Sequence, residues 1–86
     1  PAIKLYEQVL TDQRRVLGDD HPHTLNTRHN LALARQGAGQ ISLAIELYQQ
    51  VLIDYQRVLG DNHPHTLNTR HNLALAGQEG GLEREQ

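Results

Sequence analysis

The chain has 86 residues, so it makes one small domain, close to the size at which a single hydrophobic core suffices for stability. Phe, Trp, Met and Cys are absent and only three Tyr are present, so the interior is built from Leu, Ile, Val and Ala, without disulfides or thiolate chemistry. The formal net charge of −2 argues against a nucleic-acid partner, because neutralising phosphates requires clustered Lys and Arg.

The first predicted element is an amphipathic helix over residues 2–17. Its apolar side chains recur at the spacing of one buried helical face, and charged residues lie mostly between them. Gly18 ends the helix, because glycine readily adopts the left-handed conformation of a C-terminal cap. The apolar positions are Ala2, Ile3, Tyr6, Val9, Leu10, Val16 and Leu17.

A second helix is predicted over residues 22–36, beginning at Pro22, a residue favoured in the first turn. The connection to the first helix is short, so the two helices are expected to pack as an antiparallel hairpin. Apolar residues spread around most of its circumference, which indicates a helix packed between neighbours. They are Leu25, Leu31, Ala32, Leu33 and Ala34. Glycines at positions 37 and 39 break the pattern.

The third predicted helix, residues 42–59, repeats the first, and the fourth, residues 64–78, repeats the second. Overlaying residues 1–44 on residues 43–86 gives 29 identities in 44 pairs, so the chain contains a unit of 42 residues about twice. We divide it into a repeat region, 1–79, with units at about 1–42 and 43–79, and a divergent tail, 80–86, expected to be frayed. The predicted fold is all-α, with four antiparallel helices stacked as an α-solenoid.

Several of these residues resemble the tetratricopeptide repeat, in which small and large side chains alternate so that two helices approach closely. The resemblance rests on Asn30-Leu31-Ala32, Gly39, Ala44, Tyr48 and Leu52. Residues 17–24, Leu-Gly-Asp-Asp-His-Pro-His-Thr, make the unit similar to the longer repeats of kinesin light chains and related bacterial proteins, since the usual unit has about 34 residues. Arg35 and Val51 depart from the family pattern.

The resemblance implies a right-handed superhelix whose repeats pack through small and large positions. These packing residues are Tyr6, Leu31, Ala32, Ala44, Tyr48, Leu52, Leu73 and Ala74. It also implies a protein–protein interaction scaffold, in which the inner helices line a concave groove for extended peptides. Carried over to this chain, the groove residues are Asn26, His29, Asn30, Leu33, Gln36, Asn68, His71, Asn72, Leu75 and Gln78.

The chemistry of these groove residues allows two interpretations. Asn presents both a donor and an acceptor, so it can pair with a peptide main chain whatever the peptide side chain, and Leu33 and Leu75 add apolar contact. Alternatively, the Asn and Gln side chains bond across adjacent inner helices, and the leucines belong to the core.

Self-assembly is a competing function from another class. The chain begins with an outer-type helix and ends with an inner-type helix, and the same junction exists internally between residues 36 and 43. Head-to-tail stacking of copies, natural or engineered, would therefore continue the solenoid. The expected partners are a protein or peptide, and further copies of the chain bound through the terminal helices.

Six histidines recur in register as His21, His23, His29, His63, His65 and His71. A His-x-His pair suits zinc, but no third ligand stands at a fixed spacing, so we predict no metal. We expect His21 and His63 to settle the start of the helix that follows each of them. Protonating all six adds six charges to the formal −2 and gives +4, so behaviour should vary near pH 6.

No catalytic motif is present: there is no Ser-x-Gly elbow, Gly-rich phosphate loop or His-Glu-x-x-His pattern. Asp19, Asp20 and Asp61 lie beside helix starts, where carboxylates normally cap the helix or complement its dipole. We therefore predict neither an enzyme nor a cofactor.

The apolar runs are short, with at most four residues at 31–34 and 73–76, so no membrane contact is expected. Without a signal-peptide pattern or cysteines, we expect a cytoplasmic location. A chain that opens at Pro1 is expected to be a fragment.

Overall fold

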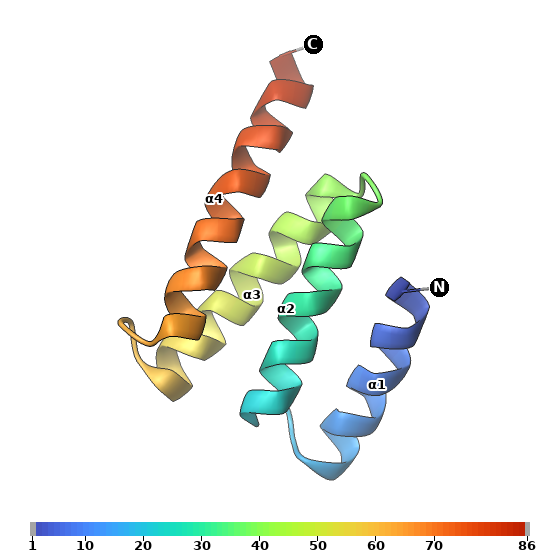
Figure 1. Cartoon of the computed structure of the whole chain (residues 1–86), viewed down its shortest axis with the longest axis vertical. Coiled ribbons are helices and arrows are strands. Elements are labelled where there is room, and N and C mark those ends of the chain that lie inside the picture. Colours follow the sequence, from blue (N-terminus) through green and yellow to red (C-terminus); the bar gives the residue numbers. More distant parts are fainter. Residues whose placement is uncertain (1, 86) are drawn as a thin grey trace.

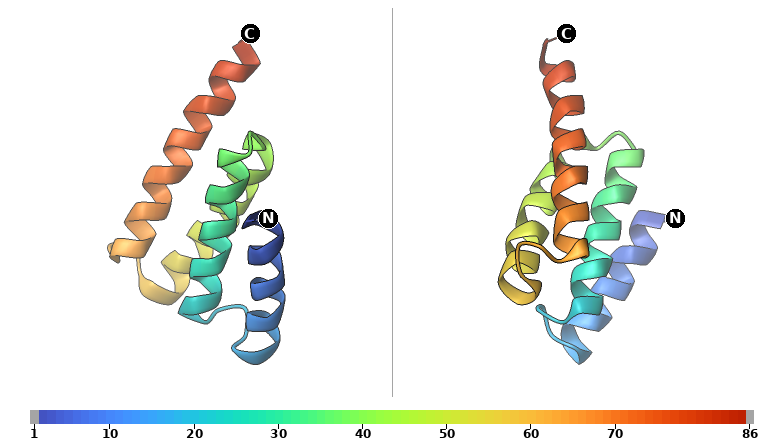
Figure 2. Two further views of the ribbon diagram at one scale, coloured as in Figure 1. Left: turned by 45° about the vertical axis from the view of Figure 1, so that its right-hand side comes forward. Right: turned by 60° about the vertical axis from the view of Figure 1, so that its left-hand side comes forward.

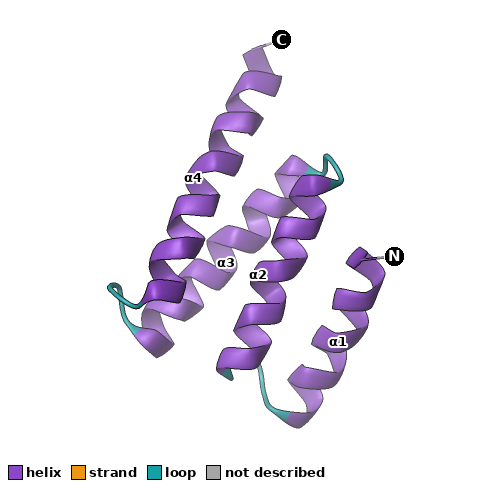
Figure 3. Cartoon of the chain, viewed as in Figure 1, coloured by secondary structure: helices purple, strands orange, loops and turns teal. Residues whose placement is uncertain are grey.

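The computed structural model describes residues 2–85, and within them the chain forms four α-helices and no strand (Figures 1 and 3). The helices are α1 (Ala2–Val16), α2 (Pro22–Gly37), α3 (Ile41–Leu59) and α4 (Pro64–Glu85). Consecutive helices run antiparallel and pack on each other, and α1 and α4 lie at opposite edges of the array (Figures 1 and 2). The predicted all-α repeat architecture is confirmed.

Both inner helices, α2 and α4, begin with the same histidine cap. The backbone N–H of His23 donates to Nδ1 of His21 over 3.1 Å, and the N–H of His65 donates to Nδ1 of His63 over the same distance. Each imidazole therefore satisfies one of the N–H groups that a helix leaves free in its first turn. The prediction that His21 and His63 settle the helix starts is confirmed.

The turns between helices rely on glycine. Gly18 and Gly60 follow the outer helices with φ of 91° and 95°, and Gly39 precedes α3 with φ of 82°. Residues with a side chain rarely adopt this region, so a change at any of these glycines would strain the turn.

The last helix is longer than predicted. We placed its end near Gln78 and expected residues 80–86 to be frayed, but α4 continues through Gly80 and Gly81 to Glu85. Gln86 lies outside the described residues. Gly81 aligns with Gly39, the glycine of the α2–α3 turn. In the first unit the turn brings Ile41 back into the core; the second unit has no apolar residue at the aligned position.

A close approach at Gly80 accompanies this extension. A Cβ atom at Gly80 would lie 3.2 Å from Cδ1 of Ile45 and 3.6 Å from Cγ2 of Ile41. The missing side chain therefore lets α4 run directly past the beginning of α3.

The core lies where α2, α3 and α4 meet, in two clusters. Ala32, Ala44, Tyr48 and Ala76 are all fully buried and form the first cluster. The second cluster comprises Leu25, Val51 and Tyr55. Small residues around Tyr48 allow the three helices to approach closely, which is the alternation of small and large residues predicted for the repeat.

The predicted packing residues are not equally buried. Leu31, Ala32, Ala44 and Tyr48 are buried, whereas Tyr6, Leu52 and Leu73 are half-buried. Ala74 is exposed, contrary to the expectation, because α3 covers its counterpart Ala32 and no described helix follows α4.

The two departures from the family pattern are accommodated by apolar packing and by polar contacts. Val51 is fully buried in the second cluster. Arg35 is half-buried, and its Nη1 donates to Oε1 of Gln40 over 2.7 Å while Nη2 lies 3.6 Å from Oε2 of Glu7. No helix of the described residues is long and apolar enough to cross a membrane.

Candidate functional site

The candidate site is the surface of α2 and α4 that carries the predicted Asn and Leu residues, and we call it the inner face. Its members are Asn26, Asn30 and Leu33 on α2, and Asn68, Asn72 and Leu75 on α4. The spacing of four and then three residues places each trio in one stripe along its helix. The two helices run in the same direction, so the stripes repeat in register (Figure 1).

Exposure along the two stripes is matched. Leu33 and Leu75 each keep 42 % of their surface exposed, Asn26 and Asn68 are exposed, and the remaining two Asn are half-buried. The degree of exposure at these positions is therefore the same in both units, although α2 and α4 have different neighbours.

His29 lies in the contact between α2 and α4 and not on the predicted surface. Only 5 % of it is exposed; its Nδ1 is 2.9 Å from Oγ1 of Thr69 and its Nε2 is 3.2 Å from Nδ2 of Asn72. Because the Asn72 amide nitrogen is a donor, Nε2 accepts, and we assign the ring proton to Nδ1. Its counterpart His71 is exposed.

Gln36 also joins helices instead of lining a surface. Its Oε1 accepts a hydrogen bond from the Tyr48 hydroxyl, and its Nε2 donates to Oε1 of Glu79, both over 2.8 Å. Burial, together with the charge of Glu79, raises the pKa of Tyr48 to about 12, so the hydroxyl stays protonated as the donor. The alternative expectation, that Asn and Gln bond across inner helices, describes Gln36 and Asn72, whereas Gln78 is exposed.

Comparison with known families decides what these helices are. A family model described as Tetratricopeptide repeat matches residues 2–52. The chain belongs to the tetratricopeptide repeat family. Such repeats generally mediate protein–protein interaction and are typically non-enzymatic scaffolds. A search of curated proteins gave no match.

A buried ion pair holds the tetratricopeptide repeat together beneath the inner face, and sequence reasoning missed it. Nη1 of Arg28 on α2 lies 2.6 Å from Oδ2 of Asp54 on α3, and only 8 % of the arginine side chain is exposed. Arg57 adds a contact of 3.1 Å to Asp54 and one of 2.6 Å to Asp20. Burial alone would raise the pKa of Asp54, but hydrogen bonds from both arginines outweigh it and lower the pKa.

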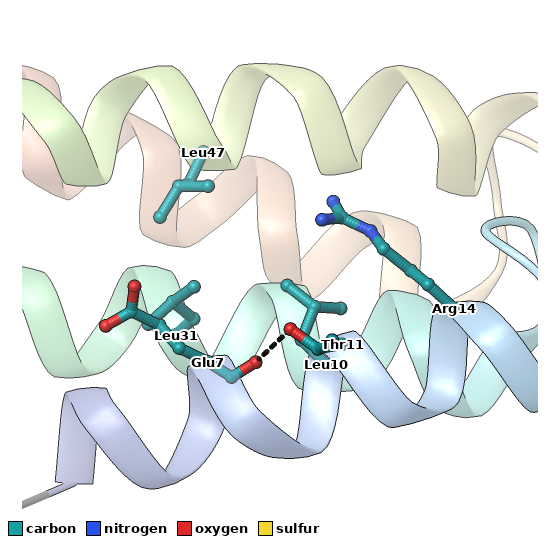
Figure 4. A pocket seen from close by; sticks show the side chains of 6 residues that line it. All are labelled: Glu7, Leu10, Thr11, Arg14, Leu31 and Leu47. Atoms are coloured by element: carbon teal, nitrogen blue, oxygen red, sulfur yellow. Dashed lines mark hydrogen bonds between the residues drawn. The ribbon is translucent and has the colours of Figure 1, made fainter.

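A hollow of about 210 Å³ opens on the opposite side of the repeat, between α1 and α3 (Figure 4). It is lined by Glu7, Leu10, Thr11, Arg14, Leu31 and Leu47. The Thr11 hydroxyl donates to the carbonyl of Glu7 over 3.0 Å, the bond drawn in Figure 4. Leu31 was predicted only as a packing residue, and the two lining charges have opposite signs.

Among the described residues, no three His, Cys, Asp or Glu side chains come together in a group that could hold a metal ion. The histidines of each His-x-His pair are instead engaged with one another at the helix start, where the rings of His21 and His23 lie 4.9 Å apart.

Acidification is expected to destabilise the repeat through His29. Burial, and to a lesser degree the nearby His65, lowers the pKa of His29 below its ordinary value of 6.5. The unfolded chain then binds more protons, so this contribution to stability is complete above that ordinary value and is lost as the pH falls through it toward the folded pKa. Urea unfolding at about pH 7.5 and about pH 5.5 measures the loss.

The matched control for this prediction is the same residue in the second unit. His29→Gln should show a smaller loss of stability between the two pH values than the wild type, whereas His71→Gln, at an exposed position, should keep the wild-type loss. An unchanged pH dependence in His29→Gln would contradict the assignment.

Proposed function

We propose that this tetratricopeptide repeat binds an extended peptide segment of a partner protein along a groove formed by the inner face. The observation that carries the proposal is the equal 42 % exposure of Leu33 and Leu75. Some packing positions, such as Ala32 and Ala74, differ in burial between the two units, whereas these two leucines keep the same exposure whatever their neighbours. A large apolar side chain kept at the surface in both units is available to a ligand.

The polar residues beside these leucines suit a peptide main chain. Each Asn offers a carbonyl acceptor and an amide donor, the two groups that pair with a peptide unit. Asn26 and Asn30 on α2 are matched by Asn68 and Asn72 on α4, and the exposed Asn26 and Asn68 give equivalent amides on neighbouring parallel helices. A peptide crossing both helices would meet an amide pair and a leucine on each, so main-chain pairing supports affinity and the leucines select an apolar side chain.

The test is selection from a displayed library of random peptides of about 12 residues, followed by affinity measurement on the peptides recovered. The double variant Asn26→Ala, Asn68→Ala removes one exposed amide from each stripe. Net hydrogen bonds of about 1 kcal/mol each predict that binding weakens roughly 30-fold.

The matched control carries the double change Gln8→Ala, Gln50→Ala, which removes equivalent exposed amides from the outer helices α1 and α3. It should bind the selected peptides as the wild type does. Peptides that bind the Asn variant equally well, or a library that yields no binder, would overturn the proposal, and thermal unfolding of each variant separates lost binding from lost folding.

A second candidate function is self-association through the terminal helices. The observation that favours it is the exposure of Val9 on α1 and Leu67 on α4, whose counterparts Val51 and Leu25 are fully buried. Molar mass in solution, measured over a concentration series, tests it.

A further inference from the structure

The interface between α2 and α3, called the seam below, has residue types that recur on α4 and α1. Its contacts serve as the template for the proposal that follows. At this seam Leu25 of α2 and Val51 of α3 are fully buried. The same residue types recur at Leu67 of α4 and Val9 of α1, where 45 % and 44 % of the surface is exposed. One half of the seam is thus repeated on α4 and the other half on α1, at opposite edges of the array (Figure 2).

We propose that α4 of one copy receives α1 of a second copy in the register in which α2 receives α3. This inference rests on the second candidate function and specifies its partner surface and its contacts. The contacts of the template are transferred by the repeat period of 42 residues. A residue of α2 is replaced by the residue 42 positions later in the receiving copy, and a residue of α3 or α4 by the residue 42 positions earlier in the incoming copy.

Transferring the first core cluster by this shift gives the same residue type at each position. Ala32, Ala44, Tyr48 and Ala76 form it within the chain. The corresponding residues across the new junction are Ala74 of the receiving copy, and Ala2, Tyr6 and Ala34 of the incoming copy. Ala2 and Ala74 are exposed and Tyr6 is half-buried, so each has surface left to bury.

When the polar contacts of the template are transferred in the same way, opposite charges face each other across the junction. The buried Arg28–Asp54 pair becomes Arg70 of the receiving copy against Asp12 of the incoming copy, and both of these side chains are exposed in the single chain. The bonds of His29 to Thr69 and Asn72 become bonds of the exposed His71 to Thr27 and Asn30 of the incoming copy.

Several positions differ from the template and set the strength of the junction. The buried Ile41 has no counterpart in α1, and Glu79, which accepts from Gln36, becomes Gly37 of the incoming copy. Tyr55, only 1 % exposed in the second cluster, is replaced by Gln13, whose Oε1 is buried without a hydrogen-bond partner among the described residues. Asp20, which pairs with Arg57 within the chain, is replaced by Asn62, so Arg15 of the incoming copy meets a neutral amide. The junction between copies is therefore weaker than the internal seam.

The contact is heterologous, because the two copies use different surfaces, so it continues from copy to copy unless the rotation closes a ring. Each added copy places its α2 beside α4 of the copy before it. The inner face is thereby lengthened by two further stripes of Asn and Leu, one on α2 and one on α4.

Sedimentation equilibrium of the 86-residue chain over a concentration series tests the register. The wild-type mass should rise with concentration. Arg70→Glu and Asp12→Lys each place like charges across the junction and should weaken association by at least about 30-fold, each variant remaining folded by circular dichroism. An equimolar mixture of the two variants should associate again, because the introduced glutamate of one then meets the introduced lysine of the other, and the unchanged Arg70 meets the unchanged Asp12.

The matched control is Glu46→Lys, a charge reversal at an exposed position of α3 that makes none of the converted polar contacts, which should leave association unchanged. The double variant Gln13→Tyr, Asn62→Asp restores two residues of the template and should associate at lower concentration than the wild type. A wild-type chain that stays monomeric at every concentration would overturn self-association itself. A rising wild-type mass that Arg70→Glu leaves unchanged, or a mixture that fails to associate, would overturn the register alone.

Discussion

Replacing Tyr48 with alanine is expected to lower the free energy of unfolding by about 3–5 kcal/mol, the usual loss for truncating a buried aromatic side chain. Tyr48 is fully buried in the first core cluster, its ring lies 5.7 Å from that of His29, and its hydroxyl donates to Gln36. The change would therefore open a cavity where α2, α3 and α4 meet. Since 86 residues confer roughly 4–13 kcal/mol in total, urea unfolding should detect a large loss.

The chain contains its own control for this prediction. Tyr6 occupies the equivalent place on α1 but is half-buried, so Tyr6→Ala should lower the free energy of unfolding by roughly 1 kcal/mol, measured at low protein concentration where copies do not associate. Tyr48→Phe keeps the ring and removes one hydrogen bond, which predicts a loss of about 1 kcal/mol. Equal losses for Tyr48→Ala and Tyr6→Ala would show that the two units are buried alike, against the structure.

Most of the fold was predictable from the sequence because the helix signals are local. Apolar periodicity, the glycines after each outer helix and Pro22 and Pro64 at the starts of the inner helices placed most helix boundaries within one or two residues. The end of α4 was not predictable in this way. Gly39 and Gly81 are the same residue at aligned positions, yet α2 has ended before Gly39 whereas α4 continues through Gly81, so the glycine itself does not decide whether the helix ends.

The candidate site was predictable as two stripes but not residue by residue. The family resemblance placed Asn30 and Leu33 on one surface of the inner helix, and in the structure Leu33 is exposed and Asn30 half-buried. It did not separate His29 from its neighbour Asn30, because that requires knowing how closely α4 approaches α2. The contact of His29 with Thr69 spans 40 residues of sequence, which no local pattern reports.

Local sequence patterns also could not predict which residues are buried at the edges of the array. Ala32 and Ala74 have the same neighbours in sequence, yet one is fully buried and the other exposed. The difference arises because a repeat buries its faces only against the next repeat, so identical units acquire different environments by their place in the stack.

Replacing Asp54 with alanine is expected to lower the free energy of unfolding by about 3–5 kcal/mol, because it leaves the Arg28 guanidinium buried without its counter-charge. This loss exceeds the contribution of the ion pair to the free energy of unfolding, because the charge of Arg28 stays buried after its partner is removed. Asp12→Ala is the matched control at the equivalent place on α1, where the carboxylate lies 3.7 Å from Arg15 and both side chains are exposed. That change should alter stability by less than about 1 kcal/mol at low protein concentration.

Two further measurements separate an unpaired charge from lost packing. The double variant Arg28→Met, Asp54→Leu removes both charges and should recover much of the stability lost in Asp54→Ala, since apolar residues often replace a buried pair without loss. Because the pKa of Asp54 is lowered in the folded state, its contribution is present above the unfolded value and is lost as the pH falls through the folded one. Asp54→Ala should therefore lose less stability than the wild type on acidification below about pH 4. A double variant no more stable than Asp54→Ala would mean that the pair acts through its geometry, holding α2 at a fixed distance from α3, and not through its charges.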